Sequence, residues 1–557
     1  MVARPSSPVT GARGTTLVIA GLAAILATQL VWIKRTNFTG FDEWLIIDLV
    51  SRGIADIPYA NRALELIWLF PSALYPYSLA PYAVLHGAYC FSSGLLVFLL
   101  ARRLAPGRPF LWPLTAVFAI VWGPGDLARL STLERTCYAA FTFGMLSAIW
   151  LLVESSRLRS VPLLAFGTLM AFLVTRSYEA VVPLLCVAPL LLLYERGEHG
   201  GGFRIWVVAW EGVLALALLL IGWPILFSKE QMHYQLQVLG LDLSPARVGM
   251  RLLWQYLFHL APVVLSSPRE LLTAAVPVAA LTFAGVAFAW VWWVGGTADG
   301  PETRCFYARS TLVGLTWAGL GYGMFVLTPV GHTALRMQFL SAPGIALCLA
   351  SIASLVATFF PPRWRLLALG VMGAWVVAVG AGRTVAMQEA WDAASAYPSQ
   401  MRMLGELTRQ VPDVKPHTLI VLLDQGKAWR ASYGFRHAVQ YLYQGRASGL
   451  VHGAWDALYP TFFTPEGIRV EPWSVLRAPW GARVSVNQYN EVIVARYSPE
   501  GRVDVLEKWP GEFPPVPPGE RYEPESRIVA GSPPPERAIL DHPTPTTTLG
   551  PLMSHGL

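Results

Sequence analysis

The residues best suited to chemistry lie in one polar stretch, residues 36–78, between two long apolar runs. This stretch carries seven charged side chains: Asp42, Glu43, Asp48, Arg52, Asp56, Arg62 and Glu65. Ionisable groups beside a membrane are costly unless they are paired or used in function. A carboxylate at this place is suited to take a proton from an acceptor hydroxyl as a general base. The stretch therefore predicts a catalytic carboxylate at a membrane surface.

Asp42 and Glu43 are the two catalytic candidates, and their spacing separates their roles. Neighbours on a helix point about 100° apart, so the two carboxylates do not meet at one substrate atom. If residues 42–56 are helical, Asp48–Arg52 and Arg52–Asp56 are ion pairs at i,i+4 spacing. Asp42 is then the working carboxylate, and the other charges are scaffolding. The alternative is a solvated polar face with helix-capping acids.

The composition indicates a polytopic membrane protein. Of 557 residues, 54% are hydrophobic and only 14% are charged, whereas soluble proteins carry about 25% charged residues. The net charge of +7 comes mainly from arginine in short loops, where cytoplasmic positive charge is expected. No basic stripe marks a soluble domain, so we predict no nucleic-acid partner. The five cysteines have neither zinc-site nor disulfide-framework spacing.

Eleven apolar runs predict an α-helical transmembrane module over residues 1–383. The runs cover residues 15–33, 79–101, 110–123, 137–153, 161–175, 180–194, 205–227, 271–294, 310–329, 338–360 and 366–383. The run 110–123 is short and has prolines at its ends, so it either crosses the membrane or forms a re-entrant segment. If it spans, basic loops alternate with longer ones, which places the N-terminus in the cytoplasm and loops 34–78 and 228–270 outside. Within the second loop, residues 245–260 predict an interfacial helix or a loop helix packed on the bundle.

A small extracytoplasmic α/β domain is predicted over residues 384–509. Its expected elements are helices at 399–411 and 431–443, a buried strand at 417–424, a hairpin from 483–486 and 491–497, and a last strand at 503–509. The final stretch, residues 510–557, is rich in proline, serine and threonine. That composition predicts disorder.

Asp42–Glu43, just after the first span, resembles the acidic pair of the GT-C membrane glycosyltransferases, in the Asp-Glu form of protein O-mannosyltransferases. The run Asn61-Arg62-Ala63-Leu64-Glu65 is similar to an arginine-leucine motif of bacterial membrane proteins of this type. The layout over residues 1–383 also matches: a cytoplasmic N-terminus, about eleven spans, long first and fourth outer loops and an outer C-terminal domain. The sequence motif itself covers two residues.

The resemblance implies an inverting transfer of a sugar from a polyprenyl phosphate to a hydroxyl on a protein, lipid or glycan. The leaving phosphate then needs cations or hydrogen-bond donors. Candidates at the outer surface are Arg62, Arg176, His332 and Arg336. For the arginines the alternatives are a snorkelling side chain or an ion pair, such as Arg176 with Glu179. His332 alone is more often structural.

Asp126 is the candidate for the second acidic residue that some GT-C enzymes carry, sometimes for a metal. Asp42 with Asp126 is a thin ligand set for a divalent ion, so no obligatory metal is predicted. The resemblance implies no cofactor, because the lipid-linked sugar is a substrate.

Two other classes compete with the enzyme. One is a transporter or flippase, which would carry paired charges or broken helices in the middle of its spans. Glu211 is the main charged residue within a predicted span. The other is a non-catalytic polysaccharide assembly protein of the cell envelope. The arginine, alanine, glycine and proline bias favours a GC-rich bacterium, hence a location in the bacterial cytoplasmic membrane.

Overall fold

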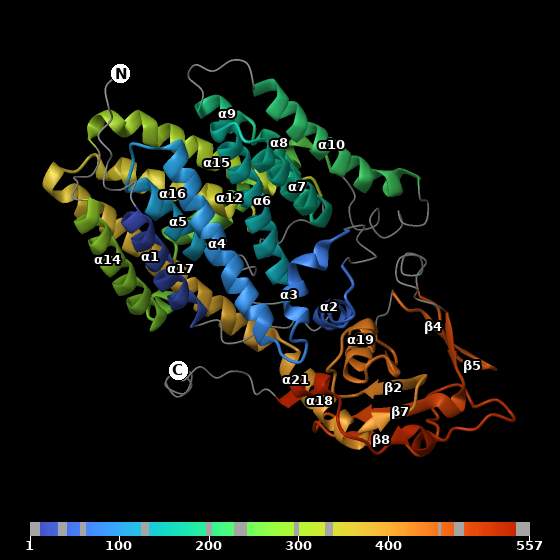
Figure 1. The fold of residues 1–557 in the computed structure, drawn as a ribbon. Coiled ribbons are helices and arrows are strands. Elements are labelled where there is room, and N and C mark those ends of the chain that lie inside the picture. Colours follow the sequence, from blue (N-terminus) through green and yellow to red (C-terminus); the bar gives the residue numbers. More distant parts are fainter. Residues whose placement is uncertain are drawn as a thin grey trace.

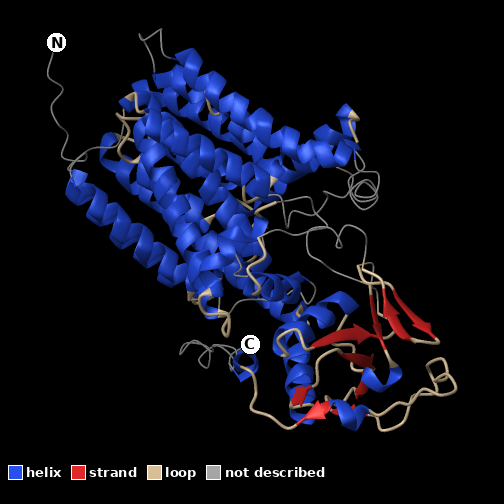
Figure 2. Cartoon of the chain, turned by 45° about the vertical axis from the view of Figure 1, so that its right-hand side comes forward, coloured by secondary structure: helices blue, strands red, loops and turns tan. Residues whose placement is uncertain are grey.

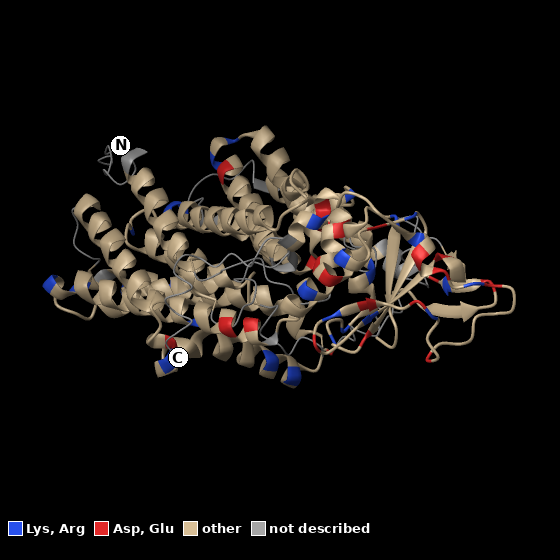
Figure 3. Cartoon of the chain, turned by 90° about the horizontal axis from the view of Figure 1, so that it is seen from below, with Lys and Arg blue, Asp and Glu red and all other residues tan. Residues whose placement is uncertain are grey.

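The computed structural model describes residues 12–31, 42–55, 63–123, 133–195, 203–227, 242–294, 300–328, 338–454, 458–472 and 484–541. It has two parts (Figure 1). A large bundle of helices forms one, and all described strands lie in the smaller C-terminal part (Figure 2). Charged side chains gather on the C-terminal part and at the junction, while most of the bundle carries none (Figure 3). This distribution is that of a multi-pass membrane protein with a polar domain.

The bundle contains most of the helices predicted from hydropathy. They are α1 (Ala12–Leu30), α4 (Ala80–Leu104), α5 (Leu111–Val121), α6 (Leu133–Leu158), α7 (Val161–Ser177), α8 (Val182–Val187), α9 (Leu190–Glu195), α10 (Phe203–Phe227), α14 (Ala275–Val294), α15 (Arg304–Val326), α16 (Ala342–Ala357) and α17 (Pro362–Ala394). Among the described residues, five helices are long and apolar enough to cross a membrane, those of α4, α6, α10, α14 and α17. The count of eleven spans stays a prediction.

Helix α5 corresponds to the weakest predicted span. Its 11 residues give a length of about 16 Å, well short of the roughly 30 Å hydrocarbon core. Nearly all of its side chains are buried, because α1, α4, α16 and α17 pack around it. Its length agrees with the re-entrant alternative better than with a full span.

Two hydrophobic clusters fill the bundle, and one of them continues into the C-terminal domain. The first cluster joins α4, α6 and α7 with buried residues of the domain, such as Leu404 and Phe435. The second joins α1, α5, α14, α15, α16 and α17. Burial of a shared core resists separation of the two parts, since apolar surface exposed to water costs about 25 cal/mol per Å².

The predicted helix in the second long loop is α12 (Pro245–Leu260). One side of it packs on α15, where the Nδ1 of His259 lies 2.6 Å from the Tyr322 hydroxyl. Its opposite side exposes large apolar residues, among them Trp254 and Phe258. The helix therefore packs on the bundle, as one alternative predicted, and its position at the membrane interface stays a prediction.

Helix α17 crosses the predicted domain boundary at residues 383–384. It runs unbroken for 33 residues, or about 50 Å, so it extends well beyond an apolar core. The predicted boundary therefore lies inside a continuous helix. The apolar composition stops near Gly382, but the polar residues after it are good helix formers and continue the same helix.

The C-terminal domain is built around a four-stranded sheet in the order β3-β2-β7-β8. Strand β2 is parallel to β3 and to β7, and β8 is antiparallel to β7. The elements are α18 (Tyr397–Gln410), β1 (Asp413–Val414), β2 (Thr418–Asp424), α19 (Ser432–Leu442), β3 (Ala447–Val451), β4 (Thr461–Thr464), β5 (Gly467–Val470), β6 (Ser485–Asn487), β7 (Val492–Tyr497), β8 (Val503–Val505) and β9 (Ile528–Val529). The predicted α/β character, both helices and the central strand are confirmed.

Two sequence expectations for this domain are wrong. The hairpin expected from residues 483–497 does not form, because β6 pairs with β5 in a separate sheet while β7 pairs with β2 and β8. The disorder expected from Pro510 onward does not hold for residues 510–541. Phe513 is buried there and β9 pairs with β1. Proline-rich chain needs few backbone partners of its own, so a few anchored side chains suffice to hold it.

Candidate functional site

The candidate site begins with α2 (Asp42–Ser51), the helix of the polar stretch. Its first turn carries Asp42 and Glu43, where negative charge is favoured by the helix dipole. Residues 43–50 are all buried, so this short helix is enclosed by protein on every side. It ends at Ser51, and Gly53 follows with φ +71°, a left-handed value that suits glycine. The predicted helix to residue 56 is therefore too long.

Asp42 lies half-buried at the junction between the bundle and the C-terminal domain. The Tyr433 hydroxyl, at the start of α19, donates a hydrogen bond of 2.7 Å to its Oδ1. These two residues are 391 positions apart in the chain. The domain thus supplies a group that touches the candidate base directly.

Asp48, one helical turn and a half further along, is held from two sides. Arg52 Nη2 lies 2.6 Å from its Oδ2, which confirms the predicted i,i+4 ion pair. His437 Nδ1, from α19, lies 2.7 Å from the same oxygen. His437 Nε2 in turn lies 3.0 Å from the Tyr459 hydroxyl. These contacts hold Oδ2 of the buried Asp48 from two sides, which indicates a structural role for this residue.

His437 is neutral at ordinary pH in this setting. Burial lowers its pKa below 6.5, the hydrogen bond and charge of Asp48 oppose this, and Arg52 and Arg436 lower the pKa further. Burial has the larger effect on this pKa, because the imidazole has almost no exposed surface. A neutral ring donates its Nδ1 proton to Asp48 and accepts from Tyr459 through Nε2.

Three aromatic side chains of α19 form one stripe that faces α2. Tyr433, His437 and Tyr441 follow each other at four-residue spacing, which places them on one side of a helix. Tyr441 donates its hydroxyl to the Pro76 carbonyl and packs its ring 6.3 Å from the Trp44 ring. The stripe contacts α2 at Asp42, Trp44 and Asp48. Figure 1 shows the two helices beside each other.

The other acids of the stretch are enclosed. Glu43 has no exposed surface, and Glu65 is almost as fully buried. A buried side chain does not reach a substrate that approaches from outside. Of the two catalytic candidates, Asp42 is the one with access.

Arg176 is the described member of the predicted phosphate-binding set. It ends α7, where Ser177 accepts a hydrogen bond of 2.9 Å from Trp68 and donates one of 2.9 Å to the Leu64 carbonyl. Both α7 and α2 pack against η3 (Glu65–Leu69). Arg176 Nη1 is buried and has no hydrogen-bond partner among the described residues. This Nη1 therefore does not pair with Glu179, which was the alternative to a phosphate-binding role.

Arg62, Asp126, His332 and Arg336 lie outside the described residues. Asp56, the second predicted partner of Arg52, also lies outside them. The structure brings Asp42 together with Tyr433. It places Arg176 in the last turn of α7, a helix that packs on η3 as α2 does.

No protein-family model matches the chain, and no curated protein matches it. The geometry around Asp42 therefore carries the weight of any functional conclusion.

Sequence reasoning missed Tyr433, His437 and Tyr459, all in the C-terminal domain. The four-residue spacing of Tyr433, His437 and Tyr441 in an amphipathic helix was the available signal. It shows that α19 has a polar aromatic side, but only the fold shows that α2 is what this side contacts.

Proposed function

We propose that this protein is a membrane glycosyltransferase that moves a sugar from a polyprenyl-phosphate donor to an acceptor hydroxyl outside the cytoplasm. The observation that carries the proposal is the setting of Asp42: it is half-buried at the junction of the bundle and the C-terminal domain, with the Tyr433 hydroxyl 2.7 Å from one carboxylate oxygen. One oxygen is thus oriented by the protein, and the carboxylate keeps partial access.

In the proposed reaction, the acceptor oxygen attacks the anomeric carbon while the bond from that carbon to the phosphate oxygen breaks. The carboxylate of Asp42 takes the acceptor's proton. The phosphate leaves with the bonding electron pair and remains on its lipid. A single displacement inverts the anomeric configuration.

Arg176 is the described side chain proposed to stabilise the leaving phosphate. Its support is a buried Nη1 without a partner, because a guanidinium in that state gains most from a charge-assisted hydrogen bond to an anion. His332, Arg336 and Arg62 remain proposed members of the same set.

The test uses membranes from cells that produce the full chain, with undecaprenyl-phosphate-linked glucose, mannose, galactose or N-acetylglucosamine as separate probes. Release of undecaprenyl phosphate is measured by mass spectrometry. Asp42→Asn should slow release by about 10²–10⁴-fold, the usual contribution of a general base. Asp504→Asn, an exposed carboxylate of β8, is the matched control and should leave release unchanged. Equal rates for wild type and Asp42→Asn with every probe overturn the proposal.

A further inference from the structure

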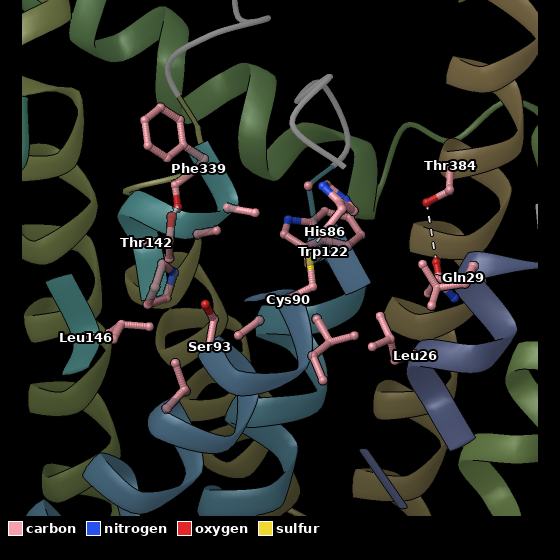
Figure 4. Close-up of a pocket in the computed structure, with 18 residues that line it drawn as sticks. Leu26, Gln29, His86, Cys90, Ser93, Trp122, Thr142, Leu146, Phe339 and Thr384 are labelled. Atoms are coloured by element: carbon pink, nitrogen blue, oxygen red, sulfur yellow. Dashed lines mark hydrogen bonds between the residues drawn. The ribbon is translucent and has the colours of Figure 1, made fainter. Parts of the chain in front are cut away.

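A second site, separate from Asp42, lies inside the bundle. A cavity opens between α1, α4, α5, α6, α16 and α17, with an empty volume of about 800 Å³ that includes its open mouth. Its walls combine apolar residues from both hydrophobic clusters, for example Leu146 and Val97 from the first and Leu26 and Ile120 from the second. The cavity thus lies between the helices of the two hydrophobic clusters (Figure 4).

Several buried polar side chains converge on this cavity from opposite sides. Thr384 donates to the Oε1 of Gln29 at 3.3 Å on one side. His86, Ser93 and Thr142 line the other parts of the wall, as Figure 4 shows. Polar groups at membrane depth are expensive and mark functional sites by default. A mainly apolar cavity with a few convergent polar groups has the composition of a ligand site.

The chemistry of the lining selects an uncharged ligand. The described lining residues include no lysine, arginine, aspartate or glutamate. A phosphate brought there would lose its hydration without gaining a cation, which costs several kcal/mol or more. Amide, imidazole and hydroxyl groups instead match the donors and acceptors of a hydroxyl-rich group. Arg176 is not among the lining residues, so the cavity is distinct from the proposed phosphate site.

Ser93 offers a place for a ligand hydrogen bond. Its hydroxyl oxygen is buried and has no partner among the described residues, a state that costs about 1–3 kcal/mol unless a ligand or water satisfies it. Cys90, one turn before it on α4, also lines the cavity and is half-buried.

We propose that this cavity binds the uncharged, hydroxyl-rich head of an amphiphile, such as a neutral glycolipid, with the apolar tail along the bundle. The inference goes beyond the proposed glycosyl transfer and does not depend on Asp42.

The test follows alkylation of Cys90 by N-ethylmaleimide in the full chain, held in phosphatidylcholine nanodiscs. Cys137→Ala, Cys186→Ser and Cys348→Ala leave Cys90 as the reporter and the exposed Cys305 as an internal control. Octyl glucoside and octyl phosphate are the probes, and mass spectrometry measures the alkylation rate at each cysteine. At twice its dissociation constant, a bound ligand slows labelling about threefold, because the free fraction falls by 1 + [L]/Kd.

Octyl glucoside should slow labelling of Cys90 but not of Cys305, and octyl phosphate should slow neither. Ser93→Leu fills the cavity and should remove the protection, whereas Thr282→Leu on α14, which does not line it, should keep it. Thermal unfolding checks that Ser93→Leu folds, and Ser93→Ala replaces it if it does not. Protection by neither probe, or equal protection by both, overturns the proposal. Asp42→Asn protein should retain the protection, so this test fails independently of the proposed function.

Discussion

At the scale of single residues, the contact between Tyr433 and Asp42 decides what Asp42 can do. A hydroxyl that donates to a carboxylate fixes the position of the oxygen that accepts the hydrogen bond. The Asp42 side chain is half-buried, so it keeps partial access from outside. Glu43, its neighbour in sequence, is fully buried, so adjacent acids of the same chemistry have different roles here.

Tyr433→Phe removes this hydrogen bond and little volume. Hydrogen bonds to charged groups contribute about 1.5–3 kcal/mol, so the maximal rate of sugar transfer should fall roughly 10- to 100-fold. Steady-state kinetics on membranes measure the maximal rate, and thermal unfolding measures the stability of the variant. An unchanged maximal rate contradicts a role of Tyr433 in orienting Asp42.

At the scale of elements, α2 and α19 work as a pair. Helix α2 is short and carries a buried acid at its centre, so it depends on the partner helix for its place. The hydrogen bond between His437 and Asp48 is the central contact between the two helices. Arg52 pairs with the same carboxylate from the solvent side, and half of the Arg52 side chain is exposed.

His437→Ala removes a hydrogen bond to the charged carboxylate of Asp48 and should destabilise the protein by about 1.5–3 kcal/mol, while Arg52 still faces Asp48. Tyr459→Phe removes only one neutral hydrogen bond and should cost about 1 kcal/mol. Thermal unfolding followed by tryptophan fluorescence compares the two. A loss for Tyr459→Phe as large as that for His437→Ala contradicts this ranking.

The same pair predicts a pH dependence of stability. Burial lowers the pKa of His437 below 6.5, so the unfolded chain binds this proton more readily than the folded one. Stability from this group is complete above pH 6.5 and is lost as the pH falls below it. The unfolding temperature of the wild type should therefore drop between pH 6.5 and 5. His437→Gln should show a shallower drop over that interval, and an unchanged slope contradicts the assignment.

Helix α17 depends on close approach of small residues to its neighbours. A Cβ at Gly380 would lie 2.6 Å from the Val121 carbonyl oxygen, whereas one at Gly370 meets nothing within 4 Å. Gly380→Ala should destabilise by about 1–3 kcal/mol through overpacking. Gly370→Ala, on the same helix, should be neutral or stabilising by up to about 1 kcal/mol. Thermal unfolding in one detergent compares the two, and equal effects contradict the packing account.

Local sequence patterns predict many of the helices and strands. They do not predict the contacts between the bundle and the C-terminal domain. Apolar runs and turn residues predicted α12, α18, β2 and α19 closely, because each forms from neighbours in sequence. The pairing of β6 with β5, and the contact of Tyr433 with Asp42, join distant segments whose local sequence is silent about the partner. The prediction of disorder for residues 510–541 was wrong because their composition resembles that of a disordered chain, whereas Phe513 and β9 anchor the segment.

At the scale of the whole molecule, the continuous core from α6 through α2 to α19 joins the bundle and the domain into one unit. The domain therefore lies on the same side of the membrane as Asp42. If the chain crosses the membrane an odd number of times, this side is opposite to the N-terminus.

A labelling experiment with two cysteines decides the orientation. Cys305 is exposed in the first turn of α15, and the arginines beside it predict a cytoplasmic position. Ser526→Cys introduces an exposed thiol in the C-terminal domain. The variant carries Cys90→Ala and Cys186→Ser as well, so that residues 305 and 526 carry the accessible thiols among the described residues. A membrane-impermeant maleimide applied to intact spheroplasts should label residue 526 and leave Cys305 unlabelled until the membrane is permeabilised. The reverse pattern places Asp42 in the cytoplasm, where nucleotide sugars are available, and removes the reason for a lipid-linked donor. Labelling of both thiols before permeabilisation places them on one side and contradicts the odd number of crossings from which the outer position of Asp42 was inferred.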